Sequence, residues 1–511
     1  MARDVVFERG VVAQPERRHA GYRTASVNAG RSDVVVVGAG AAGLFACLCA
    51  ARAGARVTLV SARPLAETAS YWAQGGLAAA LAVDDSPERH LQDTIEAGRG
   101  LVRRSAAEAL TEEAPARFRD LEALGVRFDA DRRGNLALGL EGGHGARRVV
   151  HAGGSATGRR ILRQLSADVA EDPRIEVLEG ARAGRLLARD GRCSGVALED
   201  GRTLTARGTI LATGGAAALW SRTTNPPGSF GSGLLLARVA GAALADLEFT
   251  QFHPTAVVGV RGREGFLITE AIRGEGATLH DAHGERFVDE LAPRDAVARA
   301  IFRALREQEI PAVSLDMRHV DPGRFPNVVQ ALREAGLDPM VERVPVAPAS
   351  HYMMGGIVTD LHGRSQVDGL YAVGECACTG LHGANRLASN SLSECFVFGR
   401  RAALHALGEP EPEPGTATAT TTASEPVAPP PTRETRKAMW RHAGLERDAE
   451  GLKPLLDDPH PLARLVARSA LFREESRGAH ARADFPAADP ALDGRHTVVD
   501  GDEPPRLVAW A

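Results

Sequence analysis

Three short apolar runs, each followed directly by glycine, divide the chain. They are SDVVVVGAGAAG at 32–43, RGTILATGGAAA at 207–218 and GLYAVGE at 369–375. An apolar run that ends in a tight turn is typical of a buried strand in a parallel α/β sheet. Because the first and third runs lie far apart, the pattern predicts one domain in two parts, 32–246 and 352–408, with 247–351 inserted between them.

The pattern changes after residue 408. Residues 409–431 consist largely of Pro, Thr, Ala and Glu, which have little to bury, and this composition predicts a flexible linker. Beyond it, apolar residues recur at helical spacing in ETRKAMWRHAGL and HPLARLVARSALFREESRGAH, which predicts a C-terminal helical domain over 432–487. Residues 488–511 are expected to form a tail. Residues 1–31 lack the apolar core of a secretory signal and are expected to form a disordered extension.

Composition narrows the class of protein. The 511-residue chain has a formal charge of -4 and no long basic block, so we expect no nucleic-acid partner. No apolar run approaches the roughly 18 residues that cross a bilayer, so we expect a soluble, cytoplasmic protein. The six cysteines form no CxxC pair and fit reduced thiols. A metal site on Cys376 and Cys378 is an alternative, but no second ligand pair stands at a suitable spacing.

A glycine motif follows the first strand. Gly38, Gly40 and Gly43 form GxGxxG at the start of an apolar, helical stretch, where glycines allow a close approach to a pyrophosphate and the helix N-terminus attracts an anion. The predicted dinucleotide contacts are Gly38, Ala39, Gly40, Ala41, Ala42 and Gly43. A simple packing turn is the alternative. The acid that usually grips the ribose is missing after RVTLVSA, where Ser61 is the candidate substitute.

Three further segments favour FAD as the dinucleotide. SYWAQGG supplies hydroxyls, an amide and glycines that suit a flat ring and its ribityl chain, at Ser70, Tyr71, Trp72, Ala73, Gln74, Gly75 and Gly76. The strand in GLYAVGE brings Glu375 toward the cofactor hydroxyls. SNSL, with Ser391 and Leu392, is typical of a helix start with free backbone donors. Elements spread over 300 residues indicate one extended cofactor.

Ten blocks give the chain a family resemblance. Over about 32–486 it resembles the fumarate reductase and succinate dehydrogenase flavoprotein group, and within it the L-aspartate oxidase family, through GAGAAG, AQGG, EGGHGARRVVHAGG, FTQFHPTA, FLITEAIRGEGA, ELAPRD, SHYMMGGI, GLYAVGE, HGANRLASNSL and ESRGAHARADFP. The implied fold is α/β, a Rossmann-like FAD-binding domain with an inserted α+β capping domain and a C-terminal helical domain. Ala69 replaces the histidine that bonds flavin in the succinate dehydrogenase branch, so non-covalent FAD is implied.

The resemblance also implies a pocket for a dicarboxylate. Arg386, with help from His253 and His351, corresponds to a clamp on one carboxylate, and Arg294 meets the other end. Planar, always charged guanidinium groups suit carboxylates. The alternative for Arg386 is a structural ion pair with a carboxylate such as Glu394. For any one histidine taken alone, a core or surface role is the default.

Three further residues are implied near the substrate. Glu141 matches a glutamate that distinguishes aspartate oxidases, where a carboxylate stabilises the α-ammonium group and repels substrates that lack it. A solvated loop glutamate is the alternative. Thr269 corresponds to a hydroxyl contact with the substrate and Glu270 to a carboxylate that relays protons with Arg294. Two positions depart from the family pattern, Ser232 where an aspartate is common and Ala62 where a lysine is common.

The implied activity is the oxidation of L-aspartate to iminoaspartate. Oxygen, giving hydrogen peroxide, or fumarate would reoxidise the flavin, and the product would pass to quinolinate synthase in de novo NAD biosynthesis. Two alternatives stay open at this point. One is a soluble fumarate reductase or a succinate dehydrogenase flavoprotein subunit, against which Ala69 and Glu141 argue. The other is a flavin-binding scaffold or sensor without catalysis.

Overall fold

The computed structural model describes residues 32–65, 68–412 and 429–510. The expected N-terminal extension, 1–31, and most of the expected linker lie outside the described residues. Within them, no helix has the length and apolar character needed to cross a membrane.

A five-stranded parallel sheet forms the centre of the first domain. Its order is β17-β10-β1-β2-β6, and every neighbouring pair is parallel. The strands are β1 (Val34–Val37), β2 (Val57–Ser61), β6 (Ile175–Glu179), β10 (Gly208–Leu211) and β17 (Leu370–Ala372). The three glycine-terminated runs therefore lie side by side in one sheet, which confirms the Rossmann-like fold class.

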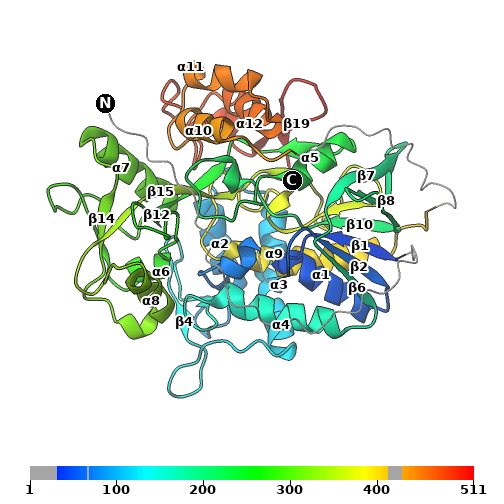
Figure 1. The fold of residues 1–511 in the computed structure, drawn as a ribbon, viewed down its shortest axis with the longest axis horizontal. Coiled ribbons are helices and arrows are strands. Elements are labelled where there is room, and N and C mark those ends of the chain that lie inside the picture. Colours follow the sequence, from blue (N-terminus) through cyan, green and yellow to red (C-terminus); the bar gives the residue numbers. More distant parts are fainter. Residues whose placement is uncertain (1–31, 66–67, 413–428, 511) are drawn as a thin grey trace.

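Helices and small sheets surround this centre (Figure 1). The helices are α1 (Ala41–Arg52), α2 (Pro87–Ala97), α3 (Arg104–Ala123), α4 (Thr157–Glu171), α5 (Ser232–Val239) and α9 (Asn390–Ala406). The small sheets contain β3 (Leu77–Ala78), β4 (Leu138–Gly139), β5 (Val149–Val150), β7 (Ala183–Arg189), β8 (Arg192–Leu198) and β9 (Thr203–Thr205). Phe45 of α1 meets Phe396 of α9 edge to face at 5.2 Å, within an apolar cluster that covers the sheet. Short 3₁₀ turns include η1 (Ala69–Trp72), η2 (Ala217–Leu219) and η4 (Gly374–Cys376).

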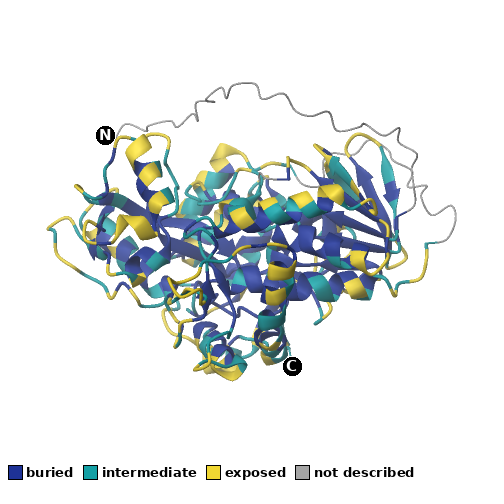
Figure 2. Cartoon of the chain, turned by 90° about the horizontal axis from the view of Figure 1, so that it is seen from below, coloured by how far each residue is buried: buried dark blue, intermediate teal, exposed yellow. Residues whose placement is uncertain are grey.

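The inserted segment folds around its own antiparallel sheet. The sheet order is β12-β15-β14-β13, built from β12 (Thr250–Val257), β13 (Thr278–His280), β14 (Val313–Asp316) and β15 (Val344–Met353). Its helices are α6 (Glu270–Gly274), α7 (Arg294–Glu307) and α8 (Pro326–Glu334), with the 3₁₀ turn η3 (Pro322–Arg324). A separate apolar cluster, which includes Val297, Ile301 and Leu315, fills this unit. Figure 2 shows buried residues running from this unit into the parallel sheet.

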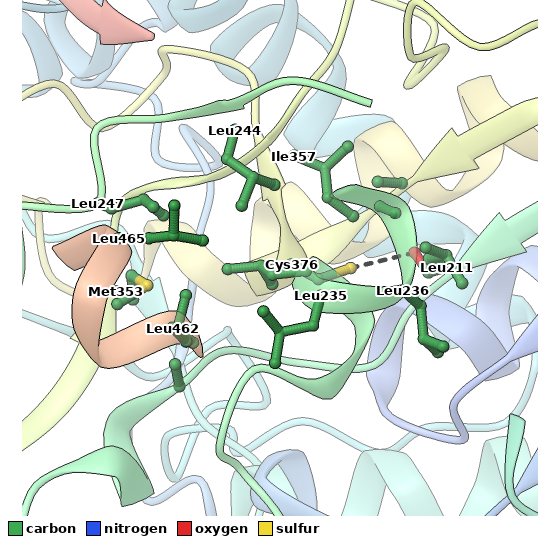
Figure 3. Close-up of a cluster of buried hydrophobic side chains, with 14 of the residues drawn as sticks. Leu211, Leu235, Leu236, Leu244, Leu247, Met353, Ile357, Cys376, Leu462 and Leu465 are labelled. Atoms are coloured by element: carbon green, nitrogen blue, oxygen red, sulfur yellow. Dashed lines mark hydrogen bonds between the residues drawn. The ribbon is translucent and has the colours of Figure 1, made fainter. Parts of the chain in front are cut away.

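The C-terminal segment packs into the core of the first domain. It contains α10 (Arg433–His442), α11 (Ala449–Leu452), η5 (Lys453–Asp457) and α12 (Pro461–Phe472). Leu462 and Leu465 of α12 lie in one apolar cluster with Leu211 and Cys376 (Figure 3). The C-terminal helices therefore share a core with the parallel sheet.

The end of the chain differs from the predicted tail. Residues 488–511 contain η6 (Pro490–Leu492) and the strands β19 (Arg495–Val499) and β20 (Arg506–Ala509). β19 joins a sheet of order β18-β16-β11-β19-β20, with β11 (Leu244–Ala245), β16 (Gly356–Val358) and β18 (Ala377–Cys378). Leu244 pairs with Val499 there, so the end of the chain is held by a strand from the first domain. Within the predicted helical domain, 432–487, the last helix, α12, ends at Phe472.

Candidate active site

One cavity crosses from the parallel sheet to the inserted domain. It encloses about 660 Å³, within the usual range for small-molecule and cofactor sites. Of the predicted cofactor contacts, it is lined by Gly38, Ala39, Gly40, Ala41, Ala42, Ser61, Ser70, Trp72, Ala73, Gln74, Gly75, Gly76, Glu375, Ser391 and Leu392. Of the predicted substrate contacts, it is lined by His253, Thr269, Glu270, Arg294, His351 and Arg386. Both predicted sets of residues therefore face one space.

The sheet end of the cavity suits a pyrophosphate. Gly38 has a φ of +112°, and a Cβ there would lie 2.2 Å from the carbonyl oxygen of Ala212, so the turn requires glycine. At Gly40 the helix α1 begins without a side-chain cap or an acidic residue in its first turn, which leaves its positive end available to an anion. Gly43 does not line the cavity. A Cβ at Gly43 would lie 1.9 Å from the Gly38 carbonyl oxygen, so this glycine serves the packing of the turn.

The end of β2 faces the same cavity without an acid. Ser61 donates a 2.5 Å hydrogen bond to the carbonyl oxygen of Arg63, so its hydroxyl proton is already used within the loop. Its oxygen can still accept a hydrogen bond from a ribose hydroxyl. The two departures from the family pattern, Ala62 and Ser232, also line the cavity.

The SYWAQGG segment forms the middle of the wall. Gln74 donates a 2.7 Å hydrogen bond to the carbonyl oxygen of Leu267 in the inserted domain. Its own buried Oε1 has no hydrogen-bond partner among the described residues, as expected of an acceptor placed for a ligand. Tyr71 lies outside the lining and packs against Trp72 at 5.3 Å. The glycine turn, the uncapped helix and this free acceptor together fit an extended dinucleotide such as FAD.

Arg294 and Arg386 meet at one side chain. The Oε1 atom of Gln251 accepts from Nη1 of Arg294 at 3.4 Å and from Nη2 of Arg386 at 3.1 Å. Gln251 is fully buried and is fixed by hydrogen bonds from its Nε2 to Asn385 Oδ1 and to the Arg386 carbonyl oxygen, both 2.9 Å. One neutral oxygen thus holds two guanidinium groups close enough for a small anion to contact both.

Arg386 is buried without an anionic partner. Its residue exposure is 4%, and within the described part of the chain it forms no ion pair with a carboxylate. Nη1 donates to Ser391 Oγ at 2.8 Å, while the buried Nε has no partner among the described residues. Burial and the charge of Arg294 lower the pKa of Arg386 to about 10, which keeps it charged at neutral pH. The alternative of an ion pair with Glu394 is wrong, because that carboxylate instead accepts from Tyr352 and His382 at 3.0 Å each.

Two neutral histidines complete this end of the pocket. His253 and His351 face each other with ring centroids 5.2 Å apart. Burial and the charges of nearby arginines hold both pKa values well below the usual range. Nδ1 of His253 accepts from the Thr255 amide at 3.3 Å, so its proton lies on Nε2, a buried atom without a partner among the described residues. This N–H can donate to a carboxylate oxygen.

Arg294 begins α7 and is held by a carboxylate. Its Nε donates to Oε2 of Glu270 at 2.5 Å, and Oε1 of Glu270 accepts from the Gly142 amide at 3.0 Å. The buried Arg273 lies 3.6 Å from the same Oε2. Thr269, the residue before α6, is buried and lines the cavity. Arg294, Glu270 and Arg273 therefore form an Arg-Glu-Arg series, of which Arg294 and Glu270 line the cavity and Arg273 does not.

Glu141 is the one predicted substrate contact that does not line the cavity. It is 3% exposed, so the solvated-loop alternative is wrong. Its Oε2 accepts from Ser389 Oγ at 2.6 Å, and its Oε1 lies 3.7 Å from Nε2 of His151. Burial opposes its ionisation, but His151 and the charge of Arg294 outweigh burial and lower the pKa to about 2. A full negative charge thus stands directly behind Ser389, which does line the cavity.

Sequence reasoning did not name Gln251 or Tyr352 as residues of this site, and it included Ser389 only as part of the segment SNSL. Gln251 lies two positions before His253 in FTQFHPTA, and Tyr352 directly follows His351. Ser389 precedes α9 with a φ of +62°, a strained conformation for a residue other than glycine. All three stand inside blocks that had been recognised, so position within those blocks was the available signal.

Cys376 and Cys378 are the residues for which the sequence left a metal site as an alternative. No group of three or more metal-ligating side chains is found in residues 32–65, 68–412 and 429–510. Cys376 donates to the Leu211 carbonyl oxygen at 3.1 Å, and Cys378 lies 3.6 Å from Asp246 Oδ2. Both thiols are buried, and burial raises their pKa values, which disfavours the thiolate that binds metals.

Two family models match the chain. Residues 33–392 match one described as an FAD binding domain, and residues 455–508 match one described as the fumarate reductase flavoprotein C-term. The second match covers α12, β19 and most of β20, so most of the predicted tail belongs to a known domain. FAD as the cofactor is therefore confirmed.

Known relatives resemble nearly the whole chain. An L-aspartate oxidase of Caulobacter vibrioides is 46% identical, over 92% of this chain and 96% of its own length. An L-aspartate oxidase of Streptomyces coelicolor is 42% identical, over 92% and 91%. Among solved structures, the quinol fumarate reductase of E. coli matches with a TM-score of 0.82 at 28% identity, covering 94% of this chain and 96% of that chain.

Proposed function

The chain belongs to the L-aspartate oxidase family, and we propose that it oxidises L-aspartate to iminoaspartate with FAD as the cofactor. The observation that carries this proposal is the buried Arg386, which has no carboxylate partner among the described residues and shares Gln251 with Arg294. A buried cation needs an anion, and a four-carbon dicarboxylate can supply one carboxylate to each guanidinium.

The residues of this chain bind the dicarboxylate substrate and orient it. Arg386, with the Nε2–H of His253 and with His351, holds one carboxylate, and Arg294 meets the other, with Thr269 as a further hydroxyl contact. Charge-assisted hydrogen bonds contribute about 1.5–3 kcal/mol each, so a few of them can hold a small dianion. Fixing both ends of the substrate leaves its Cα–H bond in one orientation, which lowers the entropic part of the barrier. FAD, when bound, supplies the acceptor for the hydride of that bond.

Glu141 provides the preference for an amino acid. Its charge lies behind Ser389, at the cavity wall, and attracts the α-ammonium group of aspartate. A substrate without that group leaves the carboxylate uncompensated. Arg294 stays charged and orients the substrate during amine oxidation, and Glu270 fixes its direction. In the fumarate-reducing direction, the Arg294–Glu270 pair could also pass a proton.

The remaining steps concern the electron acceptor and the product. We propose that oxygen or fumarate accepts the electrons from reduced FAD, so that L-aspartate and O₂ give iminoaspartate and H₂O₂. Iminoaspartate is then the substrate of quinolinate synthase in de novo NAD biosynthesis. We propose that the protein acts in the cytoplasm, together with the enzyme that consumes its product.

A direct comparison of two substrates tests the proposal. The purified, FAD-loaded protein is supplied with L-aspartate or with succinate, and peroxide release and the reduction of an artificial acceptor are measured. We expect rapid turnover of L-aspartate with peroxide formation and little turnover of succinate. Dominant succinate turnover would assign the chain to the fumarate reductase and succinate dehydrogenase activity instead. FAD binding without turnover of either would favour a scaffold or sensor.

A further inference from the structure

Arg386 lies on the face of an aromatic ring. Its guanidinium carbon is 4.5 Å from the ring centroid of Tyr352, which is 6% exposed. A ring face attracts a cation most strongly when both are desolvated. Tyr352 follows His351 on β15 and lines the same cavity. The aromatic face therefore provides part of the stabilisation that a carboxylate would normally give to a buried arginine.

The far end of the Tyr352 ring is held by a buried carboxylate. Oε2 of Glu394 accepts from the Tyr352 hydroxyl and from Nε2 of His382, both at 3.0 Å. Its Oε1 accepts from Thr379 Oγ1 at 3.3 Å. Glu394 is 1% exposed and belongs to α9, the helix that begins just after Arg386. A phenol that donates to a carboxylate carries more electron density in its ring, so this contact strengthens the attraction for Arg386.

This arrangement has a consequence for ligand binding. A carboxylate paired directly with Arg386 would occupy the N–H edge of the guanidinium group, the edge that binds carboxylates bidentately. Tyr352 contacts the face instead and therefore places no carboxylate on that edge. Only neutral oxygens, those of Ser391 and Gln251, accept from the edge, and Nε has no partner among the described residues. The positive charge is stabilised and oriented while remaining available to an incoming anion.

We propose that Tyr352, fixed by Glu394 and His382, is a positioning residue that keeps the Arg386 clamp charged, oriented and open for one carboxylate of the substrate. The inference rests on the proposed function in one respect, because it takes the ligand to be a C4 dicarboxylate. It goes further in naming the group that replaces a counterion. Since both succinate and L-aspartate present a carboxylate to Arg386, the loss of Tyr352 affects both ligands equally, unlike the loss of Glu141.

Three substitutions in the full-length, FAD-loaded protein test this inference. Tyr352→Leu removes the ring face, and we expect the Kd of succinate and the KM of L-aspartate each to rise about tenfold, with a smaller change in kcat. Tyr352→Phe keeps the ring but not its link to Glu394, and Glu394→Gln keeps the link but not the charge. Both should raise the two constants about threefold. Succinate binding is read from the perturbation of the flavin absorbance, which requires no turnover.

A matched control is available on another strand. Tyr371 of β17 also has its hydroxyl against a histidine and a carboxylate, 2.9 Å from His405 and 2.7 Å from Glu409, but it does not line the cavity. Tyr371→Phe should leave the Kd of succinate unchanged. FAD content and melting temperature are measured for every variant, and if Tyr352→Leu fails to load FAD, Tyr352→Phe and Glu394→Gln carry the test.

The outcomes separate the two proposals. The positioning role would be overturned if Tyr352→Phe and Glu394→Gln left the Kd of succinate unchanged and Tyr352→Leu changed this Kd no more than Tyr371→Phe does. Aspartate oxidation would stand in that case. The wild-type protein could instead bind succinate without oxidising L-aspartate, while the Tyr352 variants raise the Kd of succinate. That result would support the positioning role and reject the proposed activity. A tenfold rise for L-aspartate alone, with succinate unaffected, would also overturn the inference.

Discussion

Arg386 and Arg473 are both buried and both lie on aromatic rings, but they differ in their counterions. Arg473 stacks on Phe249 at 5.1 Å and donates to Glu248 at 2.7 Å and to Glu475 at 2.8 Å. Arg386 stacks on Tyr352 and has no carboxylate among the described residues. Burial acts to lower the pKa of both arginines. For Arg473 the nearby carboxylates of Glu248 and Asp246 outweigh burial, so its pKa is raised, whereas the pKa of Arg386 is lowered. A structural arginine is paired within the fold, whereas a binding arginine has a place for an external anion.

Removing Arg386 should reduce activity and spare stability, whereas removing Arg473 should do the reverse. Arg386→Leu is expected to lower kcat/KM for L-aspartate by roughly 10³- to 10⁴-fold, because two charge-assisted contacts of about 1.5–3 kcal/mol each are lost. The free energy of unfolding should stay the same or rise, because an uncompensated buried cation is removed. Steady-state kinetics and urea denaturation of the FAD-loaded protein measure the two effects. Strong destabilisation with near-normal activity would show that Arg386 is a structural residue.

The reverse is expected for Arg473. Arg473→Leu leaves the buried Glu248 without its partner, and breaking a buried pair in this way costs about 3–5 kcal/mol of the free energy of unfolding. Glu475 keeps a 2.8 Å contact with Arg477, so only one carboxylate becomes unpaired. The same urea denaturation measures the loss. Residual folded protein should retain the wild-type KM for L-aspartate, and a raised KM would contradict the separation of the two regions.

A smaller effect distinguishes a ligand with an amino group from ligands without one. Glu141→Gln keeps the shape of the side chain but removes its charge, so the KM for L-aspartate should rise about tenfold, as expected for the loss of one charge contact with the ammonium group. The KM for fumarate and the Kd of succinate should change much less, because neither carries an amine. Parallel kinetics with both substrates check this. Equal changes for all ligands would remove the proposed role of Glu141.

The smallest effect concerns pH. The pKa of Arg386 is lowered to about 10, first by burial and then by Arg294, so the free protein begins to lose this charge as pH approaches 10. Succinate affinity should therefore be constant between pH 7 and 9 and fall about twofold by pH 10. His253 and His351 have pKa values well below the usual range, so their titration should leave no step between pH 6 and 8. Flavin-perturbation titrations at each pH measure the Kd, and a step near pH 6.5 would show charged histidines.

Much of the fold could be predicted because its signals are local. Three apolar runs before glycine contain strands of the central sheet. These strands are β1 (Val34–Val37), β10 within 207–218 and β17 within 369–375. The strand β19 could not be predicted in this way. Val499 pairs with Leu244, which is 255 residues away, and a short run such as HTVV gives no sign of a partner at that distance. The helix α12 ends at Phe472, and Arg473 and Glu475, which follow it, form a buried ion pair at 2.8 Å.

In the candidate site, too, some residues could be predicted from the sequence and others depend on contacts between distant segments. Arg294 and Arg386 could be predicted by resemblance, and the structure places both on one cavity. The side chains that hold them could not. Gln251 bridges the two arginines through one oxygen, and Tyr352 contacts Arg386 with its ring and Glu394 with its hydroxyl. Such contacts depend on the packing of β12, β15 and α9. Glu141 was expected near the substrate's amino group, and nothing in the sequence indicated that Ser389 would lie between its carboxylate and the cavity.

The anaerobic reaction of the FAD-loaded protein with L-aspartate tests the central claim most directly. The account predicts that L-aspartate bleaches the absorbance of oxidised flavin, that succinate only perturbs it, and that Arg386→Leu abolishes bleaching at the same substrate concentration while still binding FAD. Bleaching by succinate rather than L-aspartate, or an Arg386→Leu protein that bleaches as readily as the wild type, would contradict it.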